Sequence, residues 1–134
     1  MSILGQTIEI SEGGKIQTID SIGLMYLIME DIIELRHQLH ALAELSGREI
    51  ETNRFLCEWI EATHPDVLVK NIGGYGLASV YRGRLPGKRV MIRGDIDALH
   101  ISEPNDILYR SQHQGVSHKC GHDGHAAMLC GFAR

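Results

Sequence analysis

The sequence predicts an α/β protein, because a segment with helical periodicity precedes several short segments with strand character. Apolar residues recur at steps of four and three, the stripe of an amphipathic helix; these are Ile28, Ile32, Leu35, Leu39 and Leu42. β-Branched or alternating runs begin at residue 67. The run Val90-Met91-Ile92 is apolar on both faces, which is typical of a central strand covered on both sides.

Residues 1–20 alternate weakly between apolar and polar around Gly13-Gly14, which favours either a small hairpin or an extended leader. A helix is expected from Ser21, with Asp20 or Ser21 as its N-cap. Ser46 and Glu49 have the spacing of a capping box, which predicts a second helix through about residue 62.

His64-Pro65 ends the second helix, because proline disfavours the α conformation in the residue before it. Strands are then expected at 67–69, 77–81 and 89–93, separated by glycine and proline turn signals. A last helix is expected to begin near Asp123. Helices therefore flank a region of strands.

Composition narrows the functional classes. The 134 residues fit one domain, and 13 basic against 17 acidic residues give a net charge of −4 without a basic block. This balance disfavours nucleic acid and membrane surfaces as partners. The longest apolar run, residues 22–29, is shorter than a membrane span, and we expect no signal peptide. Three cysteines, an odd number, argue against a disulfide framework and for a reducing cytoplasm.

The strongest chemical feature is the segment His118-Lys119-Cys120-Gly121-His122-Asp123-Gly124-His125. A thiolate at Cys120 and an imidazole at His122 could face one zinc or similar ion across the flexible Gly121. A structural zinc site needs four protein ligands, and the chain has no second pair of this kind, so an open or incomplete site fits better. The alternative is that Asp123 caps the last helix and the histidines are surface residues.

Asp95-Ile96-Asp97 follows the most strand-like run. Side chains just past the carboxyl end of a strand point into the ligand crevice, so these two carboxylates could hold a metal or orient a histidine ligand. A solvated turn is the alternative. His37 and His40 are expected to be packed or surface residues of the first helix rather than ligands. Cys57 and Cys130 are expected in the core, as small apolar residues. The run 83–88 fails the spacing of a phosphate loop and is interpreted as a turn.

Four segments in order resemble the M20 metallopeptidase family. They are RHQLHALAELSGREIET from Arg36, GGYGLASVYRG from Gly73, MIRGDIDALHI from Met91 and GVSHKCGHDGHAAMLCGFAR from Gly115. The similarity is strongest to amidohydrolases that cleave N-acyl amino acids, including hippurate and auxin-conjugate hydrolases and N-acetyldiaminopimelate deacetylases. It covers about residue 33 to the end, and the Cys-Gly-His-Asp-Gly-His motif is highly specific.

The resemblance implies part of a three-layer, zinc-peptidase-like catalytic domain at 21–134, with helices packed on a central mixed sheet. It implies that Cys120 and His122 ligate metal and that Asp97 supports the metal centre. The cofactor would be a divalent metal, with zinc expected and manganese, cobalt or nickel as alternatives. The substrate would be a small N-acyl amino acid or peptide, whose amide bond is hydrolysed by water with the help of a glutamate base.

Two positions depart from the family pattern. The chain has Leu42-Ala43-Glu44-Leu45 where the family usually has His-Pro-Glu-Leu, and His100 where it has proline. The family's Glu-Glu pair and remaining histidine ligands follow the motif, and we expect them to be missing from a truncated chain. The isolated chain would then be inactive. The alternative is a non-catalytic module that binds metal or self-associates, and we expect homo-oligomers because the last helix has an uncovered apolar face.

Overall fold

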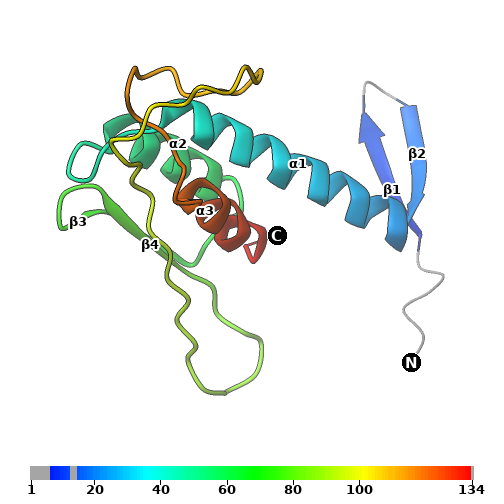
Figure 1. Cartoon of the computed structure of the whole chain (residues 1–134). Coiled ribbons are helices and arrows are strands. Elements are labelled where there is room, and N and C mark those ends of the chain that lie inside the picture. Colours follow the sequence, from blue (N-terminus) through cyan, green and yellow to red (C-terminus); the bar gives the residue numbers. More distant parts are fainter. Residues whose placement is uncertain (1–6, 13–14, 134) are drawn as a thin grey trace.

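The computed structural model describes residues 7–12 and 15–133. The elements, in chain order, are β1 (Thr7–Glu12), β2 (Lys15–Asp20), α1 (Ser21–Leu42), α2 (Ile50–Glu61), β3 (Val67–Ile72), β4 (Gly76–Val80) and α3 (His122–Gly131). Figure 1 shows α1, α2 and α3 gathered on one side of the β3–β4 hairpin. The α/β class is therefore confirmed, with its helices and strands in the expected order.

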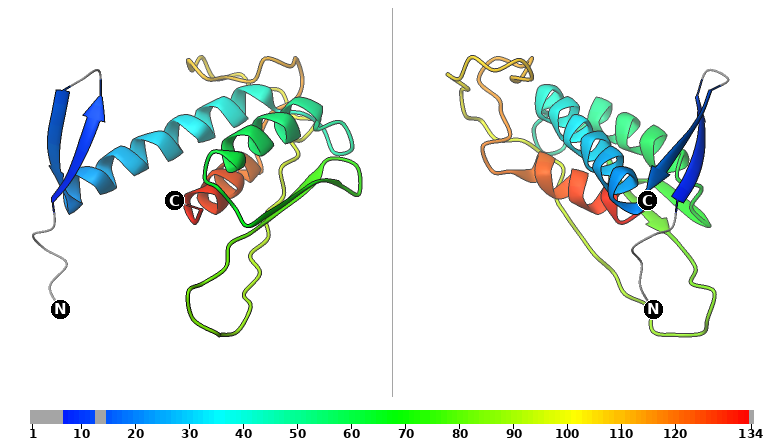
Figure 2. Two further views of the ribbon diagram at one scale, coloured as in Figure 1. Left: turned by 180° about the vertical axis from the view of Figure 1, so that it is seen from behind. Right: turned by 90° about the vertical axis from the view of Figure 1, so that its right-hand side faces the viewer.

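The core lies where the three helices meet, and Figure 2 shows α3 lying alongside α1. Its buried side chains come from all three helices: Leu35, Leu39, Leu56, Ile60, Ala126, Ala127 and Cys130. Leu35 and Leu39 belong to the predicted apolar stripe. Cys57 is also buried, so both cysteines expected in the core are found there. This packing fixes the direction in which α3 leaves the loop before it.

At the other end of α1, β1 and β2 pair antiparallel from Thr7 opposite Asp20 to Glu12 opposite Lys15. The expected turn at Gly13-Gly14 lies outside the described residues. Asp20 caps α1 as predicted, since its Oδ1 accepts a hydrogen bond from the Gly23 backbone N–H at 2.8 Å. The first turns of α1 project away from the helical core toward the hairpin (Figure 1). None of the described helices combines the length and apolar character needed to span a membrane.

The predicted capping box of α2 is wrong. The helix ends close to the expected residue, but its N-cap, Glu49, makes no side-chain cap hydrogen bond. A more distant carboxylate takes this role, because Glu44 Oε2 accepts from the Thr52 backbone N–H at 2.8 Å. The left-handed conformation of Gly47, with φ of 76°, turns the chain between Glu44 and the helix. The capping partner is therefore set by this turn rather than by local spacing.

The first two predicted strands form as the antiparallel pair β3–β4, with an irregularity between Val69 and Ile72. The third, at 89–93, is wrong, because no strand of the described chain pairs with it. Val90 and Met91 are 83% and 90% exposed instead of covered. A strand needs a neighbour for its backbone groups. Beyond this hairpin and the β1–β2 pair, strand-type pairing in the described residues consists of a parallel bridge between Leu45 and Ala98 and an antiparallel bridge between Leu99 and Ser117.

Candidate metal-ligand loop

The structure brings the three predicted site residues together at the start of α3. His122 Nδ1 lies 2.9 Å from the Asp97 carbonyl oxygen and 3.0 Å from Asp97 Oδ1. The Cys120 thiol lies 3.8 Å from the same carbonyl oxygen. Gly121, with φ of 87°, is the N-cap of α3 and turns the chain between the two candidate ligands. Asp95 pairs instead with Arg93, so only Asp97 of the two aspartates joins the site.

This arrangement fits a divalent metal in its donor chemistry. Asp97 faces Nδ1 of His122, and a histidine held in this way presents Nε2 to a ligand, as metal-binding histidines commonly do. Thiolate sulfur and imidazole nitrogen both suit zinc. Within residues 7–12 and 15–133, however, no three His, Cys, Asp or Glu side chains gather as a metal-holding group. Cys120 and His122 could therefore supply only part of a coordination sphere.

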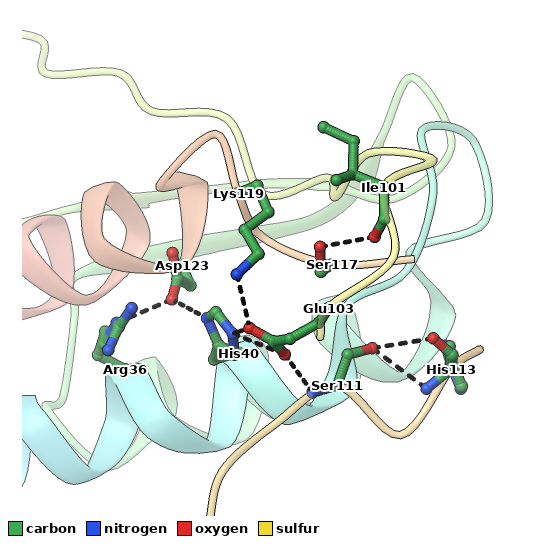
Figure 3. Close-up of polar contacts among 9 residues, drawn as sticks. All are labelled: Arg36, His40, Ile101, Glu103, Ser111, His113, Ser117, Lys119 and Asp123. Atoms are coloured by element: carbon green, nitrogen blue, oxygen red, sulfur yellow. Dashed lines mark hydrogen bonds and ion pairs between the residues drawn. The ribbon is translucent and has the colours of Figure 1, made fainter. Parts of the chain in front are cut away.

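The alternative in which Asp123 merely caps the last helix is wrong. Its side chain is 1% exposed and makes no cap hydrogen bond at α3. Instead, Asp123 Oδ2 lies 2.8 Å from Arg36 Nε and 2.8 Å from His40 Nδ1 (Figure 3). Both partners come from α1. Asp123, next in sequence to His122, thus joins the first turn of α3 to the C-terminal part of the long helix.

His40 extends this contact to a second carboxylate. Its Nε2 lies 3.0 Å from Glu103 Oε1, while its Nδ1 faces Asp123. His40 is 4% exposed, so of the two expected possibilities, a packed or a surface residue, it is the packed one. A neutral imidazole has one N–H, whereas the imidazolium form can donate from both nitrogens. The two ring nitrogens of His40 each face a carboxylate.

Glu103 is the second carboxylate, and it contacts two further groups besides His40. The Ser111 backbone N–H donates to Oε2 at 2.9 Å, and Lys119 Nζ lies 3.3 Å from Oε1. Burial by itself would raise the pKa of Glu103, but the hydrogen bonds from Ser111, His40 and Lys119 lower this pKa to about 2. The carboxyl group is therefore ionised throughout the neutral range.

We call the connected set Arg36, His40, Glu103, Lys119 and Asp123 the buried clamp (Figure 3). Tyr109 packs against it, with its ring 5.3 Å from the Arg36 guanidinium carbon and edge-on to His40 at 5.6 Å. Tyr109 also stacks on His37 at 3.8 Å. The aromatic ring therefore covers the α1 side of the clamp.

His118, at the start of the loop, is 3% exposed, so it is not the surface residue that the alternative interpretation required. Burial, the largest influence, lowers its pKa to about 4, so the ring is neutral at pH 7. Neither ring nitrogen of His118 has a hydrogen-bond partner among the described residues, and the same holds for Asp123 Oδ1. His125 is exposed, and His122 is partly buried.

An open pocket with a volume of about 430 Å³ has Asp97 in its lining. The lining combines apolar, polar and charged residues: Leu45, Ser46, Arg48, Asp97, Ala98, Leu99 and His100. Asp97 therefore both contacts His122 and borders a space that is open to solvent.

Comparison with known proteins gives this site a context. No family model matches the sequence. The N-acyl-L-amino acid amidohydrolase of Geobacillus stearothermophilus is 40% identical over 107 residues, which cover 80% of this chain and 29% of that enzyme. The N-acetyldiaminopimelate deacetylase of Priestia megaterium is 36% identical over 101 residues, covering 75% of this chain and 27% of the deacetylase.

The same relationship is found among solved structures. The YXEP protein of Bacillus subtilis, described as a dinuclear metal-binding peptidase from the M20 family, superposes with a TM-score of 0.73 at 32% identity. The match covers 78% of this chain and 29% of that one. The fold and the sequence of this chain therefore match part of a larger α/β peptidase. The chain belongs to the M20 family of peptidases and amidohydrolases, and it spans less than a third of the length of these relatives.

Proposed function

We propose that this chain contributes the Cys120/His122 half of a metal centre to a hydrolase that cleaves the amide bond of N-acyl amino acids or small peptides. The observation that carries the proposal is the meeting of Asp97, Cys120 and His122 at the start of α3. Its relatives include an amidohydrolase and a deacetylase of N-acyl compounds, and a structural neighbour is a dinuclear metal-binding peptidase.

In this proposal, the thiolate of Cys120 and Nε2 of His122 hold a divalent metal, with zinc preferred because of its affinity for sulfur and nitrogen donors. Asp97 orients His122 by accepting from its Nδ1–H. A bound metal supplies Lewis acidity, which polarises an amide carbonyl and acidifies water. The open pocket beside Asp97 would admit a small substrate to this side of the loop.

The remaining ligands and the glutamate base would come from residues outside this sequence. We therefore expect the 134-residue chain to bind metal without hydrolysing N-acyl amino acids. Three unpaired cysteines fit a reducing, cytoplasmic location. The alternative function is a non-catalytic module that binds metal or associates with itself. Met128 on α3 and Phe132, the C-cap of that helix, are 58% and 75% exposed, which favours self-association.

A Co²⁺ titration tests metal binding, because a cysteine thiolate on cobalt gives a charge-transfer absorption band. We expect this band in the wild-type chain and its loss in Cys120→Ser. Asp97→Asn should weaken binding by about 10- to 100-fold, the usual effect of removing the partner of a histidine ligand. Cys57→Ala serves as the control, because this buried thiol lies in α2, away from the loop. A band that survives in Cys120→Ser would contradict the assignment.

Hydrolysis is tested separately with N-acetyl amino acids and the same preparation. We expect no turnover by the isolated chain. Turnover that a chelator abolishes would show that this chain contains a complete catalytic centre. Metal binding without turnover fits both the half-centre and the non-catalytic module, and restoration of activity by the following part of a relative's catalytic domain would distinguish them.

A further inference from the structure

The loop that carries the candidate ligands is held by charged groups on both sides. Lys119 immediately precedes Cys120 and reaches Glu103. Asp123 immediately follows His122 and reaches Arg36 and His40. Each contact is one residue away from a candidate ligand, so any displacement of these partners is transmitted to the loop through a single peptide unit.

The two attachments are joined to each other through His40. One ring nitrogen faces Asp123 and the other faces Glu103, and the side chains of these three residues are at most 5% exposed. Directional bonds between buried carboxylates and an imidazole allow few alternative geometries. The ends of the loop are consequently tied to one point on α1 rather than to two independent surfaces.

Glu103 is itself fixed from a third direction. The Ser111 backbone N–H donates to it, and the Gln112 backbone N–H donates to the Ala41 carbonyl oxygen at 2.9 Å. The segment that contains Ser111 is therefore bound to the end of α1 next to His40. This leaves Glu103 little freedom to follow a displaced Lys119.

Within the segment, Cys120 and His122 both contact the Asp97 carbonyl oxygen. Gly121 between them adopts a left-handed conformation, and apart from its chain neighbours no atom lies within 4 Å of the position a Cβ would take there. Packing at Gly121 therefore does not determine how far Cys120 lies from His122. That distance depends on the contacts with Asp97 and on the charged attachments at Lys119 and Asp123, which hold the loop from either side.

We propose that the buried clamp positions Cys120 and His122 for metal binding, holding the loop in its binding geometry before the metal arrives. Arg36, His40, Glu103, Lys119 and Asp123 are then positioning residues that do not touch the metal. This inference rests on the proposed function, since it takes Cys120 and His122 as the ligands. A loop that is already ordered loses less entropy on binding, so affinity depends on the clamp.

The experiment compares Glu103→Gln, which removes a charge but keeps the side-chain shape, with Glu51→Gln, which changes an exposed carboxylate on α2. Both variants and the wild-type chain are titrated with Co²⁺, and amide hydrogen exchange is followed by mass spectrometry. For Glu103→Gln we expect about 10-fold weaker cobalt binding or more, and faster exchange at 119–123. Exchange at 119–123 should rise more than exchange in the α1 and α3 core, which follows only the loss of global stability. Glu51→Gln should match the wild type in both measurements.

Lys119 provides a second pair of variants with little risk to folding, because its side chain is 31% exposed. Lys119→Met should weaken cobalt binding about fivefold, in the range of a single charge-assisted contact. Lys119→Arg keeps a cation within reach of Glu103 and should restore binding to near the wild-type level. Rescue by arginine would support positioning by charge. If Lys119→Met acted only through altered packing, restoring the positive charge would not restore cobalt binding.

The outcomes separate this inference from the proposed function. Wild-type affinity and wild-type exchange in both Glu103→Gln and Lys119→Met would overturn the clamp while leaving Cys120 and His122 as ligands. If the wild-type chain shows no cobalt binding that depends on Cys120, the proposed function fails. Exchange at 119–123 then decides whether the clamp orders the loop, and unchanged exchange would overturn it as well. If Glu103→Gln does not fold, the Lys119 pair decides.

Discussion

Replacing Asp123 by asparagine tests how much the charge of the buried clamp contributes to stability. Asp123 is 1% exposed, and its Oδ2 lies 2.8 Å from both Arg36 Nε and His40 Nδ1. Breaking a buried ion pair by neutralising one partner costs about 3–5 kcal/mol. Asparagine keeps an oxygen that can accept one of the two bonds, so we expect about 3 kcal/mol. This is a large share of the roughly 5–15 kcal/mol that stabilises a typical domain.

Urea unfolding followed by far-UV circular dichroism measures this loss. With a slope of about 1.5 kcal/mol per molar urea, a loss of about 3 kcal/mol lowers the midpoint by about 2 M. Glu51→Gln is the control, because Glu51 makes an exposed pair with Arg54 and should change stability by less than about 0.5 kcal/mol. A loss below about 1 kcal/mol for Asp123→Asn would refute the view that its charge stabilises the fold.

Three further predictions concern pH, thiols and the loop backbone. The pKa of Glu103 is lowered from 4.5 to about 2, so its stabilising contribution is complete above pH 4.5 and disappears as the pH falls toward 2; acid unfolding of Glu103→Gln should lack this dependence. Burial raises the pKa of Cys57 and raises that of Cys130 to about 12, so a thiol reagent should modify only Cys120 in the folded chain and all three cysteines in urea. Gly121→Ala should cost about 1–2 kcal/mol in urea unfolding, because the site is sterically open but its φ is 87°; an unchanged midpoint would mean that the loop relaxes.

Local patterns predicted most of the helices and strands because these elements depend on neighbouring residues. The apolar stripe of α1 and its Asp20 cap are examples, since each is encoded within a few residues. The failed predictions depended on partners that are distant or absent from the described chain. The capping of α2 uses Glu44 across a glycine turn. The apolar run 90–92 has the composition of a strand, but composition does not supply a neighbouring strand.

The sequence likewise predicted one part of the candidate site, the metal-ligand loop, and missed the clamp. The spacing of Cys120 and His122, and the position of Asp97 after an apolar run, indicated residues that the structure brings together. The clamp was missed because its contacts join residues that are far apart in sequence, as with His40 and Asp123, separated by 83 positions. One signal was available. Arg36 and His40 are spaced by one helical turn beside a buried stripe, where two polar side chains require partners.

The clamp consists of hydrogen bonds and ion pairs, and these suit the positioning of metal ligands better than apolar packing does. Apolar packing stabilises α1 against α3, but it does not fix a direction and tolerates small shifts between surfaces. A metal centre needs its ligands held within a fraction of an ångström, which directional hydrogen bonds achieve better. Because His40 faces both Asp123 and Glu103, the displacement of either carboxylate removes a bond from the same ring. The two sides of the loop are therefore expected to loosen together, and the energetic effects of Asp123→Asn and Glu103→Gln should be non-additive when the two changes are combined.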